Sequence, residues 1–237
     1  MEWTDEGFVL SARRHGEGDL VLSLLTREHG RHAGLVKGGA GRRSAGLYEP
    51  GNRLRAVWRA RLSDHLGNFA CENLAQSAAA LLDEPLRLAA LSSATAVAEA
   101  ALAEREPHPR AYDGFAALIE ALVSSTDTIA WAVRYVQWEL DLLSEIGFGL
   151  DLERCAVSGD KAGLAFVSPN SGRAVTARAA EPWRERLLPL PAFLSGGAAD
   201  LPAIAQGLAL TGSFLERHVF RSEPPARVRL VARLQRA

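Results

Sequence analysis

Short runs in which hydrophobic and polar residues alternate fill the first 75 positions of the chain, and turns that contain glycine separate them. Alternation with a period of two is typical of β-strands with one buried face. The pattern predicts five strands, at residues 6–14, 19–26, 30–37, 52–61 and 66–74. Five short strands with no helix between them favour a small barrel of the OB type.

The pattern changes near residue 75, where long stretches rich in alanine and leucine begin. Their periodicity predicts helices at 78–104, 112–124, 127–146, 202–218 and 225–236. Residues 148–180 return to short strands and turns. We therefore predict an α+β fold: an OB-type β-barrel domain at 1–78, then an α-helical domain at 79–237 that carries a small strand-and-turn insertion at 148–180.

The 237 residues suffice for one large or two small domains, and the 48% hydrophobic content is typical of a folded protein. The acidic N-terminus lacks the apolar run of a signal peptide, and no window is apolar enough to span a membrane. Cys71 and Cys155 are too few for a disulfide framework. These features predict a soluble, cytoplasmic protein with reduced thiols.

Charge is distributed unevenly along the chain, although the formal net charge is only −1. Residues 31–61 hold eight basic residues and a single acid, Glu49. Residues 81–146 hold four arginines and eleven acids. The sequence thus predicts a basic barrel and an acidic helical body.

The segment 52–61 carries the most informative charge pattern. In a strand, its small and apolar residues would face the core and its four arginines would share the opposite face. That face is either a solvated exterior or a surface that follows a phosphate backbone, and we favour the second interpretation. Tyr48 and Trp58 are the nearby aromatic residues that could stack on bases, but Trp58 falls on the predicted inner face, so we favour a core position for it. The predicted DNA-binding residues are Lys37, Arg42, Arg43, Arg53, Arg55, Arg59 and Arg61.

The sequence contains no recognisable catalytic or metal-binding motif. The glycine-rich segment 34–41 lacks the Gly-Lys-Ser/Thr ending of a P-loop. The six histidines do not follow the spacing of metal ligands, and no G-x-S-x-G or H-E-x-x-H string occurs. These absences favour binding over catalysis, and we expect no enzyme activity, metal or cofactor.

Several strings, in matching order along nearly the whole chain, resemble the RecO family of bacterial DNA repair and recombination mediators. The N-terminal strings are EGFVL (6–10), Gly16-Glu17 with Asp19, Leu25-Thr26 with Gly30, Gly34, VKG (36–38), RRS (42–44) and EPG (49–51). The later strings are WEL (138–140), GFGLDL (147–152), CAV (155–157), VSP (167–169), SGRAV (171–175), Leu187-Leu188, Leu190-Pro191, Phe193-Leu194, LTG (210–212) and Phe214-Leu215.

The resemblance implies an N-terminal OB-fold, a helical C-terminal domain and no enzymatic turnover. It implies binding to single- and double-stranded DNA and annealing of complementary strands. It further implies partnership with RecR, in some members with RecF, and with the single-stranded DNA-binding protein SSB, so that RecA loads onto coated DNA.

One feature departs from part of this family, in which a four-cysteine zinc module follows the third long helix. Here Cys155 alone remains, and Ser158 stands where a C-x-x-C partner would be. One thiolate cannot hold a structural zinc ion. We therefore predict a degenerate, zinc-less insertion that its own packing holds together.

Two other functional classes remain open at this point: an OB-fold protein that binds RNA, and an enzyme whose motif is not recognisable. The position of the RecR interface does not follow from the sequence. The acidic, aromatic-ended tail of SSB would need an apolar pocket beside a cation. Arg110 and Arg134 are candidate cations for that pocket, since the helical body has few basic residues.

Overall fold

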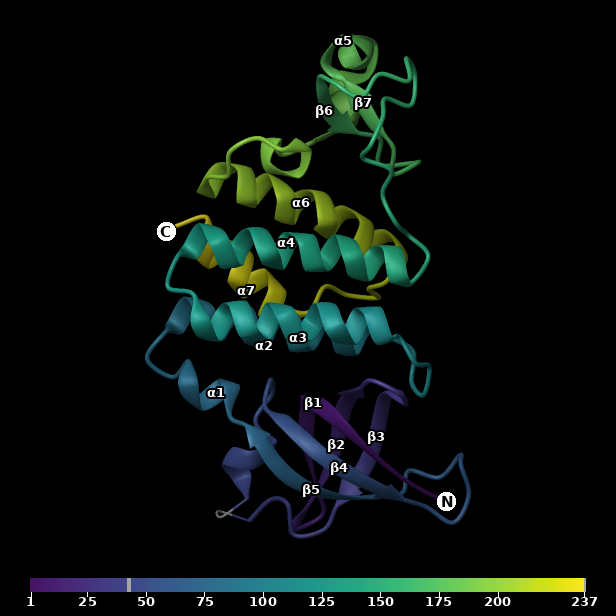
Figure 1. Ribbon diagram of the computed structural model, residues 1–237, viewed down its shortest axis with the longest axis vertical. Coiled ribbons are helices and arrows are strands. Elements are labelled where there is room, and N and C mark those ends of the chain that lie inside the picture. Colours follow the sequence, from purple (N-terminus) through teal and green to yellow (C-terminus); the bar gives the residue numbers. More distant parts are fainter. Residues whose placement is uncertain (42–43, 237) are drawn as a thin grey trace. The chain divides into compact units, whose positions relative to one another are not determined.

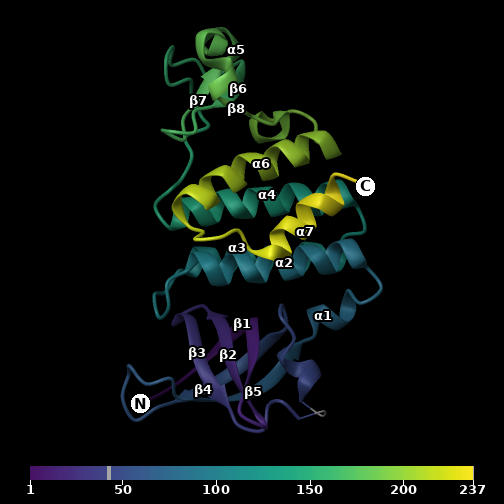
Figure 2. The same cartoon turned by 180° about the vertical axis from the view of Figure 1, so that it is seen from behind.

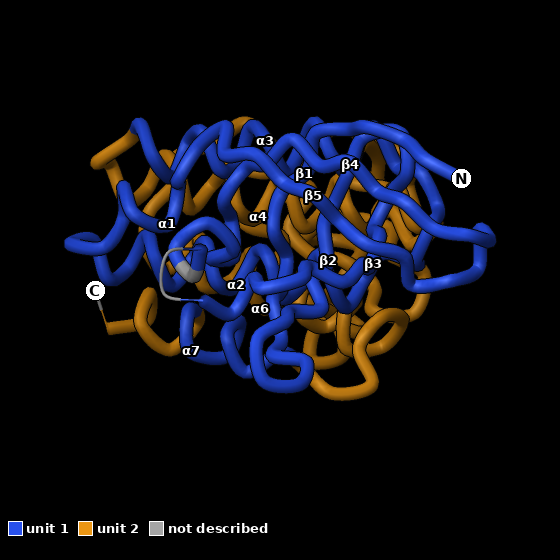
Figure 3. Tube along the Cα trace, turned by 90° about the horizontal axis from the view of Figure 1, so that it is seen from below, with its two compact units in different colours: residues 1–124, 224–230 blue, residues 125–223, 231–237 orange. Residues whose placement is uncertain are grey.

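The computed structural model describes residues 1–41 and 44–236. Contacts between Cα atoms divide the chain into two compact units (Figure 3). The first unit comprises Met1–Ser124 and Pro224–Leu230, and the second comprises Ser125–Glu223 and Val231–Ala237.

A five-stranded barrel forms the N-terminal part of the first unit (Figure 1). The strands close in the order β1-β2-β3-β5-β4, and β4 pairs back onto β1. The parallel seam between β3 and β5 rests on a single residue pair, Leu35 and Asn68. The predicted OB-type barrel is thus confirmed. The strands are β1 (Glu2–His15), β2 (Asp19–Thr26), β3 (Gly30–Val36), β4 (Arg53–Arg59) and β5 (Asn68–Ala75).

The inner face of the barrel is apolar because every second residue of its strands points inward. Leu22 and Leu54 are fully buried, and Trp58 is 2% exposed, as its position on the predicted inner face requires. Tyr48, in the short 3₁₀ helix η1 (Ala45–Tyr48), also packs into this core and is 7% exposed. The interpretation that Tyr48 stacks on bases is therefore wrong, because its ring is covered.

Three helices complete the first unit: α1 (Ser77–Ala80), α2 (Pro85–Ala101) and α3 (Pro109–Ser124). The prediction of one continuous helix at 78–104 is wrong, since a turn at 81–84 separates α1 from α2. Pro85 lacks a backbone N–H and occupies the first turn of α2, where that donor is not needed. The helix ends at Ala101 because Leu102 has an extended backbone.

Helix α2 packs against β1 and β2, and α2 and α3 lie side by side at one end of the barrel, as the view from behind shows (Figure 2). The Phe8 ring on β1 lies 5.4 Å from the Tyr112 and Phe115 rings of α3. Leu25 on β2 is 1% exposed. The barrel and these helices therefore share one compact unit, and the predicted boundary at 78/79 stays a prediction about independent folding.

The second unit is built on α4 (Thr128–Glu145) and α6 (Leu201–His218), which pack against each other. Asp127 and Asp200 cap their N-termini by accepting hydrogen bonds from backbone N–H groups. Helix α7 (Pro225–Leu234) begins in the first unit and ends in the second. Among the described residues, no helix combines the length and the apolar character that crossing a bilayer requires.

The predicted insertion at 148–180 contributes two strands to a small sheet with the strand order β7-β6-β8. Its strands are β6 (Leu164–Val167), β7 (Ala174–Thr176) and β8 (Leu188–Pro189). The sheet extends past the predicted end of the insertion, because β8 pairs with β6 after the short helices α5 (Ala177–Ala180) and η2 (Glu181–Arg186). A further 3₁₀ helix, η3 (Ala192–Ser195), precedes α6.

Candidate nucleic-acid interface

The arginines of β4 lie on the outer face of the barrel, as the alternating pattern predicts. Leu54, Ala56 and Trp58 are buried, whereas Arg55 and Arg59 between and beside them are exposed. Arg53 is half-buried, and Arg61 lies beyond the end of the strand, in the loop 60–67 that joins β4 to β5. We call this segment the β4–β5 loop.

Carboxylates from the two neighbouring strands lie among these arginines. Arg59 Nη2 is 2.8 Å from Glu2 Oε1, and Arg53 Nη2 is 2.6 Å from Glu6 Oε2, both on β1. The hydrogen bond from Arg59, together with its charge, lowers the pKa of the Glu2 carboxyl. Arg55 stands opposite Glu6 on β1 and opposite Glu72 on β5.

These ion pairs change the interpretation of the arginine face of β4, which considered the residues of that strand alone. Four guanidinium groups on one face require an anion, and the neighbouring strands supply three carboxylates. On the outer face of β1, β4 and β5, acidic and basic side chains therefore lie side by side, and the surface is not uniformly basic. The pattern of β4 alone does not reveal this arrangement, because strand pairing brings together residues that are far apart in the sequence.

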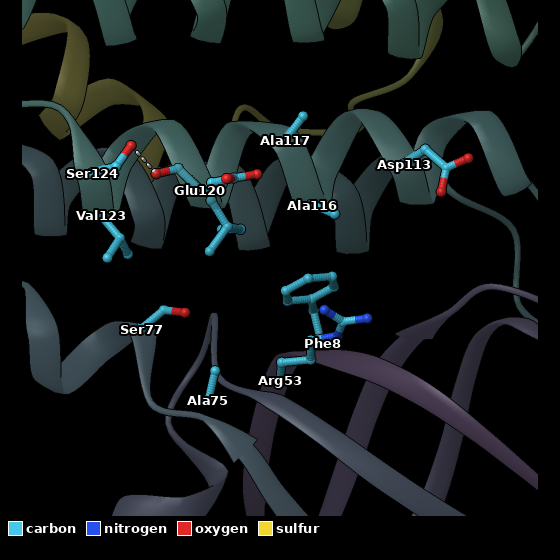
Figure 4. A pocket seen from close by; sticks show the side chains of 11 residues that line it. Phe8, Arg53, Ala75, Ser77, Asp113, Ala116, Ala117, Glu120, Val123 and Ser124 are labelled. Atoms are coloured by element: carbon cyan, nitrogen blue, oxygen red, sulfur yellow. Dashed lines mark hydrogen bonds between the residues drawn. The ribbon is translucent and has the colours of Figure 1, made fainter.

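Arg53 also borders a pocket of about 620 Å³ within the first unit (Figure 4). Its guanidinium carbon lies 5.8 Å from the centre of the Phe8 ring. Asp113 and Glu120 of α3 line the opposite wall, and neither Arg110 nor Arg134 lines the pocket. The ion pair with Glu6 and the contact with Phe8 already engage the Arg53 side chain.

Lys37, Arg55 and Arg61 differ from the paired arginines. All three are exposed, and none forms an ion pair within the part of the chain that the structure describes. Arg42 and Arg43, which were also predicted to contact DNA, lie outside the described residues. The seven predicted DNA-binding residues thus divide into two that are paired, three that are available and two that are not described.

Arg14 is an exposed cation that the sequence analysis did not select. It lies near the C-terminal end of β1 and pairs in register with Leu20, which pairs in turn with Val36. Lys37 follows Val36 directly, so both cations lie beside the β1–β2 hairpin. Backbone hydrogen bonds hold this arrangement, since Ala40 N donates to Gly18 O over 3.0 Å. The signal that could have found Arg14 is its place next to a glycine-bearing turn.

The two candidate cations for the tail of SSB lie in different units. Arg110 is exposed in the first turn of α3, and Arg134 is half-buried on α4. Burial raises the pKa of Asp141, and the charge of Arg134 opposes that increase. Each arginine therefore has to be tested by itself.

Cys155 occupies a tight turn in the second unit. Its Sγ accepts hydrogen bonds from the backbone N–H groups of Ser158 and Thr176, at 3.5 and 3.4 Å. Burial raises the pKa of the thiol, hydrogen bonds from Ser158, Thr176 and Val157 lower it, and the net result is a pKa of about 6. Within residues 1–41 and 44–236, no three His, Cys, Asp or Glu side chains converge as metal ligands.

Comparison with known proteins identifies the family. A family model described as "Recombination protein O N terminal" matches residues 1–77, and one described as "Recombination protein O C terminal" matches residues 82–227. The chain is 54% identical to the DNA repair protein RecO of Rhodospirillum centenum, over all of this chain and 96% of the relative. It is 49% identical to that of Rhodospirillum rubrum, over all of this chain and 97% of the relative. The chain belongs to the RecO family of DNA repair and recombination proteins.

Proposed function

We propose that this protein is a DNA repair and homologous recombination mediator that binds single- and double-stranded DNA through its barrel. It anneals complementary strands and, with RecR and in some settings RecF, helps to load RecA onto DNA coated by SSB. It acts in the cytoplasm as a binding protein, without catalytic residues, metal or cofactor.

One structural observation supports DNA binding by the barrel. Arg14 and Lys37 lie beside the β1–β2 hairpin and Arg61 lies in the β4–β5 loop, and these exposed cations form no ion pair with any described residue. These two loops are the ones that OB-folds use to bind oligonucleotides. Arg55, on the strand that leads into the β4–β5 loop, adds one more exposed cation. Arg42 and Arg43 stay in the proposal on the strength of their position in the sequence.

The salt dependence of binding to a labelled single strand tests this proposal. Each lysine or arginine that neutralises a phosphate contributes about 0.7 to the log–log salt slope for a single strand. The variant Lys37→Gln/Arg55→Gln/Arg61→Gln should therefore show a slope shallower by about 2. Binding should weaken for all sequences alike, because phosphate contacts carry no base information. Annealing should fall with it.

The paired arginines provide the matched control. Arg53→Gln/Arg59→Gln removes two cations from β4, the strand that also carries Arg55. These two arginines already form ion pairs with Glu6 and Glu2. We expect the salt slope of this variant to change by less than about 0.5. Equal slopes for wild type and the triple variant would contradict binding by the exposed cations. Preference for RNA over single-stranded DNA of the same length would point to an RNA-binding protein instead.

The proposed contact with the tail of SSB is tested by capture on a tail peptide. Arg110→Gln and Arg134→Gln are compared singly with wild type, since the two residues belong to different units. Loss of capture in one variant alone would identify which unit holds the tail. Unchanged capture in both would exclude these two arginines.

A further inference from the structure

The connection between α2 and α3 contains a strained residue. Arg105 has a backbone φ of 64° and is the only non-glycine residue with a positive φ among the described residues. The left-handed conformation brings Cβ close to the following carbonyl, so arginine adopts it only where the surroundings hold it there. The contacts of Arg105 therefore show what holds it.

The backbone of this connection is attached to the start of β3. Arg105 N donates a hydrogen bond to Arg31 O over 2.7 Å, and Arg31 Nε donates to Leu102 O over 2.8 Å. Gly30 lies so close that a Cβ at this position would be 2.0 Å from Glu106 O. The α2–α3 connection thus packs directly against the start of β3.

The side chain of Arg105 extends from the start of β3 to the β4–β5 loop. Nη1 donates to Ser63 O, and Nη2 donates to His65 O over 2.8 Å. Nε lies 3.7 Å from the Glu104 carboxylate. The planar guanidinium therefore binds two loop carbonyls at once, which a flexible single-point cation does not reproduce.

Other contacts hold the ends of the same loop to the barrel. Met1 N donates to Ala60 O over 2.7 Å, and Trp58 Nε1 donates to Leu66 O over 2.9 Å. Leu35 N donates to Gly67 O over 3.0 Å. Arg105 supplies the attachment of the middle of the loop, at residues 63–65.

We propose that Arg105 is a positioning residue that clamps the β4–β5 loop and so fixes the place from which Arg61 contacts nucleic acid. The inference rests on the proposed function, in which Arg61 neutralises a phosphate. A loop that is already ordered loses less conformational entropy when it binds, so the clamp raises affinity without touching the ligand. It also gives the α2–α3 connection a supporting role, because this connection holds the loop that carries Arg61.

Arg105→Gly separates this role from a merely structural one. Glycine adopts a positive φ without strain, so the variant removes the guanidinium while the backbone conformation remains accessible. We expect trypsin to cleave after Arg61 about tenfold faster in the DNA-free variant, because the loop opens more often. Affinity for a single strand should fall about threefold to fivefold.

Arg27→Gln is the matched control. It removes one positive charge from the same unit and breaks an exposed ion pair, in which Arg27 Nη2 lies 2.9 Å from Asp113 Oδ2. Cleavage after Arg61 should stay at the wild-type rate in this variant. A wild-type cleavage rate in Arg105→Gly would overturn the clamp, whether or not the protein binds DNA.

A double-mutant cycle decides whether Arg105 acts through the loop or touches DNA itself. If Arg105 acts by positioning Arg61, then Arg61→Gln should weaken binding clearly in wild type and little in the Arg105→Gly background. Fully additive losses would overturn the positioning role and make Arg105 a direct contact. Absence of DNA binding by wild type would refute the proposed function, while the cleavage rates would still decide the clamp.

Discussion

Strand β4 and the two loops near the ends of β1 carry similar positive charges but have different neighbours. On β4, Arg53 and Arg59 bind carboxylates of β1, and Arg55 faces acids on both sides. In the β4–β5 loop and beside the β1–β2 hairpin, Arg61, Arg14 and Lys37 form no ion pair within the described chain. The count of arginines along a strand therefore does not measure its capacity to bind phosphate.

The difference has a simple physical origin. Two paired strands place side chains about 5 Å apart, so an acid on the neighbouring strand can form an ion pair with an arginine that is opposite or diagonal to it, as Glu2 does with Arg59 and Glu6 with Arg53. Residues at loops and strand ends have fewer such neighbours. We expect the cations that bind nucleic acid to be those that form no ion pair with a described residue, which lie in loops, near strand ends and, for Arg55, on β4 itself.

The largest effect is expected at the end of the barrel that the β4–β5 loop covers. His32 is 5% exposed, and neither of its ring nitrogens has a hydrogen-bond partner among the described residues. Burial, the charge of Arg105 and the charge of His29 lower the pKa of His32 from 6.5 to about 4. Folding therefore favours neutral His32, so the contribution of this residue to stability is fully present above about pH 6.5 and is lost as the pH falls from about 6.5 to about 4.

His32→Phe should flatten this pH dependence, since phenylalanine keeps an aromatic ring and cannot be protonated. We expect the free energy of unfolding of wild type to fall by roughly 2 kcal/mol more than that of the variant between pH 6.5 and pH 4. Urea unfolding at a series of pH values measures the difference. Parallel curves for both proteins would show that this end of the barrel is open to water.

A smaller effect, on DNA affinity, is expected when the carboxylates beside the arginines of β4 are removed. Glu2→Gln/Glu6→Gln/Glu72→Gln leaves Arg53, Arg55 and Arg59 without acids on the neighbouring strands. Binding to a single strand should become about tenfold tighter at low salt, and the log–log slope should steepen by about 1 to 2. Stability should change little, because exposed ion pairs contribute little. An unchanged slope would mean that DNA does not pass over β4 at all.

A still smaller effect separates two adjacent arginines at the other end of β1. Arg13 Nη2 is 3.0 Å from Glu99 Oε1, whereas Arg14 forms no ion pair within the described residues. Arg14→Gln should make the salt slope shallower by about 0.7, and Arg13→Gln should change it by less than half as much. The two variants have the same charge and change adjacent residues of β1, whose side chains point to opposite faces of the strand. Equal slopes would refute the rule that pairing decides which cation binds.

The smallest effect is expected outside the barrel, in the sheet around Cys155. Excess chelator should leave folding and DNA affinity unchanged, because Cys155 Sγ has backbone N–H groups as partners and no second thiolate. Cys155→Ser should cost about 1 kcal/mol of stability and should not alter the salt slope. Stoichiometric zinc in the purified protein, or unfolding by chelator, would contradict this.

Most of the secondary structure could be predicted because it depends on local patterns. The alternation in 52–61 predicts which residues of β4 face the core, and Trp58 lies there. The turn at 81–84 was missed because Leu81 and Leu82 continue the pattern of the alanines before it, and alanine and leucine resume after Pro85, so the break looks short. Tyr48 was misplaced because nothing local to η1 shows that the barrel core closes over it.

The sequence by itself determined the OB-type barrel, the helices and the presence of excess positive charge between residues 31 and 61, since periodicity and composition are properties of neighbouring positions. Only the tertiary structure decided which of those charges are available. Glu2 and Arg59 are 57 positions apart, and Arg105 and Ser63 are 42 apart. Such pairs form through strand register and the path of a helix connection, and electrostatic energy depends on distance in space, which the order of residues does not reveal.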